Sequence, residues 1–201
     1  MGPVAIETAR LRLREWTADD VDDMLVLQSD PEVMRFLGPM PSDPAVLRAE
    51  TEEWIGRQMR IQAGWGWCRW AVELREPPER SLRGVVGFSG PGCGFPPDVE
   101  IGWTLRRELW GQGIATEAAR AILDYCFSVI GFERVISCID PGNAASLRVA
   151  AKMGLAPLDE VQHDGDTLIR HVLFNPLPDP PRDPRFRRDC VGAPQRPTPT
   201  D

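Results

Sequence analysis

Residues 108–127 read ELWGQGIATEAARAILDYCF, and two glycines, Gly111 and Gly113, stand directly before a strongly helical run. Glycine lowers helix stability relative to alanine, so two of them at this place need a physical reason. One reason is that a ligand approaches the backbone amides closely, and at a helix N-terminus that ligand is typically a phosphate. The other is that the glycines only permit a tight turn between a strand and a helix.

The same turn is similar to a dinucleotide-binding fingerprint that lacks its third glycine. The residues concerned are Gly111, Gln112, Gly113, Ile114, Ala115 and Thr116. Asp140 follows the next predicted strand, where the fingerprint would place an acid for the ribose. Against this, the turn lies past the middle of the chain and one crossover follows it, whereas a dinucleotide fold needs two such halves. A nicotinamide-dependent oxidoreductase stays open on these residues alone.

Composition limits the class of protein. The chain has 201 residues, 42% of them hydrophobic, and a net charge of −7, which suits one globular domain and argues against sequence-independent nucleic-acid binding. No apolar run is long enough to span a bilayer and no signal pattern opens the chain, so we expect a cytoplasmic protein without membrane contacts. The five scattered cysteines and two histidines favour neither a disulfide framework nor a metal site.

Hydrophobic periodicity predicts a mixed sheet with helices packed against it. Strands are expected at residues 9–16, 67–74, 82–90, 99–105, 134–139, 155–162 and 167–174, and helices at residues 17–30, 43–62, 114–130 and 143–153. One parallel strand–helix–strand crossover runs across the glycine turn. We assign residues 1–175 to one domain. Residues 176–201 are rich in proline and poor in apolar side chains, so we expect a disordered tail.

Several motifs in a fixed order resemble the GNAT acetyltransferases, and among them the RimJ/RimL type. They are TARLRLREWTADDVDDM (8–24), VEIGWTLRRELWGQGIATEAARAILDYCF (99–127) and NAASLRVAAKMGL (143–155). The resemblance covers roughly residues 8–174. It implies an α/β fold of about seven strands in a mixed, largely antiparallel sheet flanked by helices. It also implies that acetyl-coenzyme A lies in a V-shaped opening between the fourth and fifth strands.

The resemblance assigns three groups of coenzyme-binding residues. The pyrophosphate loop would be residues 110–115, with Trp110 in place of the usual Arg or Gln. The pantetheine arm would pair with the backbone of the strand end. Two side chains would face the coenzyme from the following helix, where the asparagine could also be an N-cap. Beyond the loop, the implied contacts are Trp103, Thr104, Leu105, Asn143 and Ser146.

Acetyl transfer to an amine needs a neutral nitrogen, a polarised thioester carbonyl and a proton for the leaving thiolate. Glu100 is the candidate general base, because the RimJ/RimL type often carries an acid there and strand alternation sets it opposite Val99 and Ile101. A structural carboxylate is the alternative. Many GNAT enzymes supply the proton from a tyrosine, whose place is taken here by Ala150. Ser146 is then the nearest matching hydroxyl, unless no acid is needed.

The acceptor would be a primary amine, either a protein N-terminus or a small molecule, attacking directly in a ternary complex. Trp54, Trp65 and Trp67 fall in segments that line the acceptor side of GNAT enzymes, although core packing accounts better for at least two of the tryptophans in these segments. A non-catalytic acyl-coenzyme A-binding module is the alternative function, favoured by the missing tyrosine. The sequence leaves a homodimer open.

Overall fold

The computed structural model describes residues 5–76, 81–89 and 99–177. One sheet of eight strands organises this part of the chain, in the order β1-β2-β3-β4-β5-β6-β8-β7. The strands are β1 (Ile6–Glu7), β2 (Leu11–Arg14), β3 (Arg69–Leu74), β4 (Gly84–Ser89), β5 (Glu100–Leu105), β6 (Arg134–Ile139), β7 (Ala156–His163) and β8 (Asp166–Phe174). Neighbouring strands are antiparallel except β5 and β6, which are parallel and joined by the helix that follows the glycine turn.

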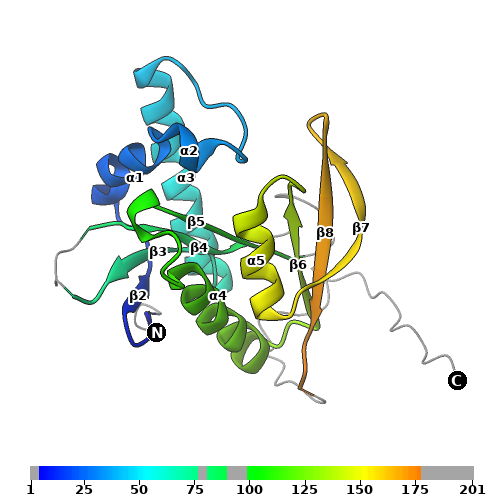
Figure 1. Ribbon diagram of the computed structural model, residues 1–201. Coiled ribbons are helices and arrows are strands. Elements are labelled where there is room, and N and C mark those ends of the chain that lie inside the picture. Colours follow the sequence, from blue (N-terminus) through cyan, green and yellow to red (C-terminus); the bar gives the residue numbers. More distant parts are fainter. Residues whose placement is uncertain (1–4, 77–80, 90–98, 178–201) are drawn as a thin grey trace, which may run out of the picture.

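Helices cover both faces of the sheet (Figure 1). They are α1 (Val21–Gln28), α2 (Pro31–Met34), α3 (Pro44–Trp65), α4 (Ile114–Tyr125) and α5 (Ala144–Met153). α1 packs against α3, whereas α4 packs against β4, β5 and α5. Asp43 caps α3 by accepting the Ala45 N–H at 2.8 Å, and Gly154 ends α5 in the left-handed conformation, both as the sequence predicts.

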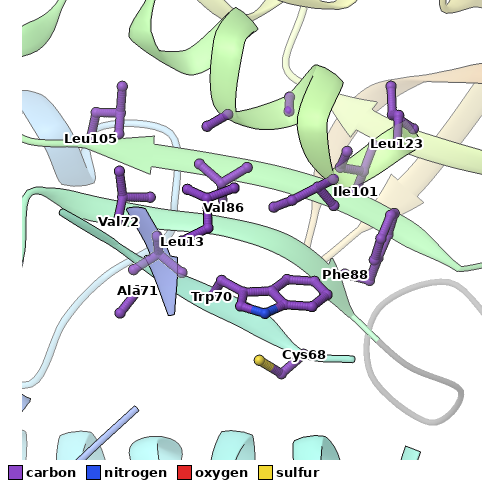
Figure 2. Close-up of a cluster of buried hydrophobic side chains, with 14 of the residues drawn as sticks. Leu13, Cys68, Trp70, Ala71, Val72, Val86, Phe88, Ile101, Leu105 and Leu123 are labelled. Carbon is purple, nitrogen blue, oxygen red and sulfur yellow. The ribbon is translucent and has the colours of Figure 1, made fainter. Parts of the chain in front are cut away.

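The hydrophobic core fills the two spaces between the sheet and its helices. Figure 2 shows Val86 and Ile101 on one side of the sheet together with Leu123 of α4, while Cys68 and Ala71 point toward the other side. All five side chains are buried. Residues that alternate along one strand therefore serve different layers, and the side chains of β5 divide between α4 and the face that carries α1, α2 and α3.

The structure adds three features to the predicted elements. The short strand β1 and the one-turn helix α2 carry too few residues to show a period, so the sheet has eight strands rather than about seven. The predicted helix to residue 130 ends as a π-helical segment, Cys126–Ile130. β8 inserts between β6 and β7, so the closing hairpin pairs with β6 through its second strand.

One expectation falls largely outside this description. The predicted tail at residues 176–201 lies outside the described residues from position 178 onward. The Gly- and Pro-rich segment at residues 90–98 lies outside them as well. Among the helices that the structure describes, none is both long and apolar enough to cross a bilayer.

Candidate active site

The sheet opens between β5 and β6. β5 pairs with β4 along its whole length, from Glu100 opposite Ser89 to Leu105 opposite Gly84. With β6 it shares a single register pair, Glu100 with Ile136, and the Ile136 N–H donates to the Val99 carbonyl at 3.0 Å. Figure 1 shows the two strands running apart from that point. The parallel crossover therefore encloses a V-shaped opening with Glu100 at its closed end.

The edge of β5 that faces this opening carries backbone hydrogen-bonding groups. The Val99 carbonyl points to β6, and because alternate residues point their backbone groups to the same edge, those of Ile101, Trp103 and Leu105 do so too. The Leu105 carbonyl is taken by the Trp110 indole N–H at 2.9 Å. Thr104 differs from the expectation: its backbone faces β4, and its side chain lines a pocket on the sheet face beneath α3.

Glu100 lies where β5 and β6 stop pairing, and its side chain adds one more hydrogen bond between these two strands. Its Oε1 accepts the backbone N–H of Cys138 at 3.2 Å, so the carboxylate ties β5 to β6 beyond their last register pair. Burial raises the pKa of Glu100, while the charges of Arg69 and His163 and the Cys138 N–H act in the opposite direction without cancelling the rise. Such a carboxylate can both fix the strand and accept a proton more readily than an exposed glutamate.

Arg69 and Ser89 accompany Glu100, and the sequence analysis missed both. Ser89 is the register partner of Glu100 on β4, and its Oγ accepts from Arg69 Nε at 3.0 Å and Nη2 at 2.5 Å. The Arg69 guanidinium lies over Gly102, where a Cβ would stand 3.3 Å from Nη2. The signal that could have identified it is a charged residue at the start of the mainly apolar strand β3, although Glu73 in the same strand gives a similar signal.

The glycine turn adopts the conformation that only glycine takes without strain. Gly111 has φ +73° and Gly113 has φ +78°, both in the left-handed region. Within the described chain no side chain caps α4, whose N-cap is Gly113 itself. The first-turn N–H groups of Ile114, Ala115 and Thr116 therefore point out of the helix end, and an anion at this position would gain both hydrogen bonds and the helix dipole.

Side chains of the turn fix the loop in place. Trp110 is 45% exposed, and its indole N–H donates to the Leu105 carbonyl at the end of β5 as described above. The Gln112 side-chain amide donates to the Glu108 carbonyl at 2.6 Å. Trp110 and Gln112 therefore hold the loop, and what the loop presents to a ligand is its backbone.

A clamp from the N-terminal segment holds the same loop, and nothing in the sequence analysis anticipated it. Arg10 donates from Nη1 to the Gln112 carbonyl at 3.0 Å and from Nε to Glu117 Oε2 at 2.6 Å. The Arg10 backbone N–H and the Thr8 hydroxyl both donate to Glu117 Oε1, at 3.0 and 2.5 Å. Slight burial would raise the pKa of Glu117, but these bonds lower it. The Thr8–Arg10–Glu117 clamp thus neutralises an acid in the first turn of α4.

Asn143 and Ser146 lie at the start of α5, after β6. Asn143 Oδ1 accepts the Ser146 N–H at 3.1 Å, so the N-cap interpretation is confirmed. Asp140 Oδ1 accepts the Gly142 N–H at 2.6 Å, which makes it the support of the turn before α5.

The proton donor common in GNAT enzymes is missing here. Ala150 occupies its position and is fully buried. The lone tyrosine, Tyr125, donates its hydroxyl to the Gly66 carbonyl at 3.1 Å and packs against Trp70 with ring centroids 5.9 Å apart. The described part of the chain therefore offers no tyrosine at the opening.

The three acceptor-side tryptophans separate in space. Trp54 lines a pocket of about 710 Å³ between the sheet and α1, α2 and α3. Trp67 is only 2% exposed and packs against Phe88 and Phe132, which makes it a core residue. Trp65 is 40% exposed at the end of α3 and contacts the Trp67 ring. Neither Trp65 nor Trp67 lines the pocket, because the chain turns away from it at the end of α3.

A sheet opened at one parallel pair, with a free strand edge and an uncapped helix end, defines the class of the GNAT acyltransferase fold. The acetyltransferase (GNAT) domain matches residues 10–156, and the chain belongs to this family of acyltransferase enzymes. Members of the family use acetyl-coenzyme A. The nicotinamide-dependent alternative is therefore wrong.

Individual relatives agree with this assignment. The chain is similar to the uncharacterised N-acetyltransferase YnaD of Bacillus subtilis (strain 168), with 41% identity over 75% of this chain and 81% of YnaD. It is also similar to the uncharacterised protein YkkB of the same organism, with 35% identity over 74% of this chain and 83% of YkkB. Among solved structures, RimL, a ribosomal L7/L12 alpha-N-protein acetyltransferase in complex with coenzyme A, shares the fold. Its TM-score is 0.68 at 17% identity, covering 85% of this chain and 98% of RimL.

Proposed function

We propose that this enzyme is an N-acetyltransferase that transfers the acetyl group of acetyl-coenzyme A to a primary amine by direct attack in a ternary complex. The observation that carries the proposal is the opening between β5 and β6, with a free strand edge along one side, a partly buried carboxylate at its closed end and an uncapped helix N-terminus at its other end. The strand edge and the helix N-terminus match the pantetheine arm and the pyrophosphate of acyl-coenzyme A, and the carboxylate matches the acceptor amine.

The coenzyme would lie along β5. Its pantetheine amides would pair with the backbone of Trp103 and Leu105, as an added strand pairs with a sheet edge. Its pyrophosphate would accept hydrogen bonds from residues 111–116, where the backbone N–H groups and the helix dipole favour an anion. Asn143 and Ser146 would face it from α5. The coenzyme supplies the activated acetyl group.

Glu100 would act as the general base. An α-amino group has a pKa near ~8 and a lysine amine near ~10.4, so a raised-pKa carboxylate suffices for the former. The base accepts the ammonium proton, directly or through water, and the neutral nitrogen attacks the thioester carbonyl. N–H groups of the β5 edge would stabilise the oxyanion. With Ala150 and Tyr125 unable to serve, the thiolate would leave unaided or with a proton from Ser146.

The acceptor would occupy the pocket beside Trp54, either as the N-terminus of a peptide or as a small amine. RimL, as a ribosomal L7/L12 alpha-N-protein acetyltransferase, acts on a protein α-amine, which supports the first alternative. We also place the enzyme in the cytoplasm, where acetyl-coenzyme A and such amines meet.

Calorimetric titration with acetyl-coenzyme A tests the proposal, with NADH as the comparison ligand. We expect micromolar binding of acetyl-coenzyme A alone, followed by acetylation of an amine in a mass-spectrometric assay with N-terminal peptides and small amines. Absence of coenzyme binding would overturn the proposal, because the opening and the glycine turn would then serve only the fold.

A further inference from the structure

The pocket beside Trp54 has a definite position relative to Glu100. It is enclosed by α1, α2, α3, the segment between α2 and α3, and one face of the sheet. Arg69 and Thr104 line its sheet side, and register places both on the face that carries Ser89 and Glu100. An amine held at Glu100 would therefore leave the rest of its molecule in this pocket.

The pocket wall is mainly apolar. Three methionines on or near α1 and α2 contribute, and such side chains adapt to ligands of irregular shape. Trp54 is held from behind by Trp16, with ring centroids 5.1 Å apart at an interplanar angle of 87°. The apolar lining residues are Met24, Leu27, Met34, Leu37, Met40, Ala49, Trp54 and Val85.

The wall of the pocket carries equal numbers of negatively and positively charged side chains. Two carboxylates, Glu50 and Glu53, and two guanidinium groups, Arg57 and Arg69, belong to the lining. Glu53 also pairs with Arg60 at 2.7 Å. A ligand with several ammonium groups would have to lose their hydration here without an excess of carboxylates to replace it, which is unfavourable.

Two neutral polar side chains of the wall, Thr51 and Gln28, are bonded to each other. The Thr51 hydroxyl donates to Gln28 Oε1 at 2.8 Å and is within hydrogen-bond distance of the Leu47 carbonyl, also at 2.8 Å. Binding in this pocket would thus depend on apolar contact, which is roughly proportional to the area removed from water.

We infer that the acceptor of this enzyme is a monoamine with an apolar body, and that polyamines and amines with a second cationic group are poor acceptors. The inference rests on the proposed function and specifies its substrate class. The amine nitrogen lies at Glu100, and the apolar body contacts Met34, Leu37 and Trp54.

Norleucinamide and lysinamide test the inference, because both carry an α-amine and the same unbranched carbon chain in the side chain. Lysinamide differs by one terminal ammonium group. We expect kcat/KM for norleucinamide to exceed that for lysinamide at least tenfold, with spermidine lower still. Equal or faster acetylation of lysinamide or spermidine would overturn the inference while leaving the acetyltransferase function intact.

A matched pair of variants places the selectivity in the pocket. Leu37 is 50% exposed and lines the pocket, whereas Val26 on α1 is 54% exposed and does not line it. Leu37→Glu should lower the norleucinamide-to-lysinamide ratio at least tenfold, since it adds a carboxylate for the second ammonium. Val26→Glu should leave the ratio unchanged. Equal effects of the two substitutions would contradict the assignment of the pocket.

A binding measurement keeps this test separate from catalysis. Methyl-labelled methionine resonances report on the pocket directly, because Met24, Met34 and Met40 line it. Norleucinamide should shift these resonances in the protein without coenzyme, and lysinamide should shift them only at much higher concentration. Equal shifts with both amides would overturn the inference even if no acetyl transfer were found. Selective shifts without coenzyme binding would support the pocket and overturn the proposed function alone.

Discussion

Glu100 combines two roles that are separable by substitution. Its Oε1 accepts the Cys138 N–H, a task that the carbonyl oxygen of glutamine can also perform. Its basicity, which burial increases by raising the pKa, is lost in glutamine. Glu100→Gln therefore removes the proposed base and keeps the hydrogen bond.

We expect Glu100→Gln to lower kcat/KM about 10²-fold or more, the usual contribution of a general base. In the wild type, the acid limb of the pH–rate profile should lie above the ordinary glutamate pKa of about 4.3, because burial raises the pKa of this carboxyl. Steady-state rates between pH 5 and 9 measure both effects. A variant with an unchanged profile would show that Glu100 serves only to join β5 to β6.

The stability of the same variant has a predictable sign. A folded-state pKa above the unfolded value contributes stability at low pH that is lost as pH rises through the folded pKa. Glutamine does not titrate, so the Glu100→Gln variant does not lose this stability as the pH rises. The melting temperature of the variant minus that of the wild type should therefore increase from acid to neutral pH. Glu100→Ala, which also leaves the Cys138 N–H without this acceptor, should melt lower than Glu100→Gln.

At the scale of elements, the Thr8–Arg10–Glu117 clamp joins the start of β2 to the first turn of α4. The pyrophosphate would sit beside Glu117, and an unpaired carboxylate there would repel it. Arg10 also fixes the Gln112 carbonyl, which sets the orientation of the loop. Arg10 is therefore a positioning residue for the coenzyme, and its loss should act on coenzyme binding.

Arg10→Ala should raise KM for acetyl-coenzyme A about tenfold, with a smaller effect on kcat. The loss of hydrogen bonds to charged groups is typically worth about 1.5–3 kcal/mol, and about 1.4 kcal/mol corresponds to tenfold. Acetyl-pantetheine lacks the pyrophosphate, so its KM should change little. The control is Arg12→Ala, which removes an exposed arginine two residues further on, in β2. Equal losses with both acyl donors would indicate general damage to the fold.

Gly113→Ala strains a backbone position at φ +78° that has free space around it, since the nearest heavy atom to an added Cβ is 3.7 Å away. The expected cost of the strain is about 1–2 kcal/mol. Part of it lowers the free energy of unfolding, and part of it changes the loop geometry and so weakens coenzyme binding. Gly154→Ala imposes comparable strain at φ +86° on the C-terminus of α5. Titration with acetyl-coenzyme A should show weaker binding for the Gly113 variant and unchanged affinity for the Gly154 variant. Weakening in both would assign the effect to stability.

The sequence predicted the elements that carry a repeating pattern. The bounds of β6 and α5 agree with their expected ranges, because apolar spacing, the Asn143 cap and Gly154 all indicate the same ends. β1 and α2 are too short to show a period. The glycine turn was predicted for a different reason. Glycine lowers helix stability, so Gly111 and Gly113 directly before a helical run indicate a turn of special conformation.

The missed site residues depend on contacts between distant segments. Arg10 and Glu117 are 107 positions apart. Arg69 of β3 bonds Ser89 of the neighbouring strand β4, 20 positions further on. Single-sequence patterns describe neighbours along one element and do not specify such pairs. Trp67 fell near the acceptor segments in sequence, yet the turn after α3 directs it into the core.

At the scale of the whole molecule, one buried ion cluster joins β2 to β3 and to the segment that precedes α1. Arg14 donates to Asp20 Oδ1 at 2.6 Å and Oδ2 at 2.8 Å, and to Glu73 Oε1 at 2.6 Å. Burial alone would raise the pKa of Asp20, but Arg14 and the Thr17 N–H lower it. The wild type should therefore lose this part of its stability on acidification below about pH 4.

Arg14→Leu should destabilise the fold by about 3–5 kcal/mol at neutral pH, because it leaves two carboxylates buried without their cation. Without Arg14 the folded-state pKa of Asp20 would rise, so the difference in stability between the variant and the wild type should narrow as pH falls toward about 4. Urea unfolding across this range measures it. Arg48→Leu, which removes an exposed ion pair with Asp22, should have little effect. A deficit independent of pH would contradict the role of charge.

The single register pair between β5 and β6 also affects the rates at which different parts of the sheet open. It divides the sheet into a ladder of β1 to β5 and a ladder of β6, β8 and β7, so cooperative backbone hydrogen bonding does not run across the molecule. Amide hydrogens inside each ladder should exchange slowly and with separate opening rates, and those along the facing edges should exchange fastest. A ligand that pairs with β5 and reaches α5 would couple the two ladders, so that they open together and less often.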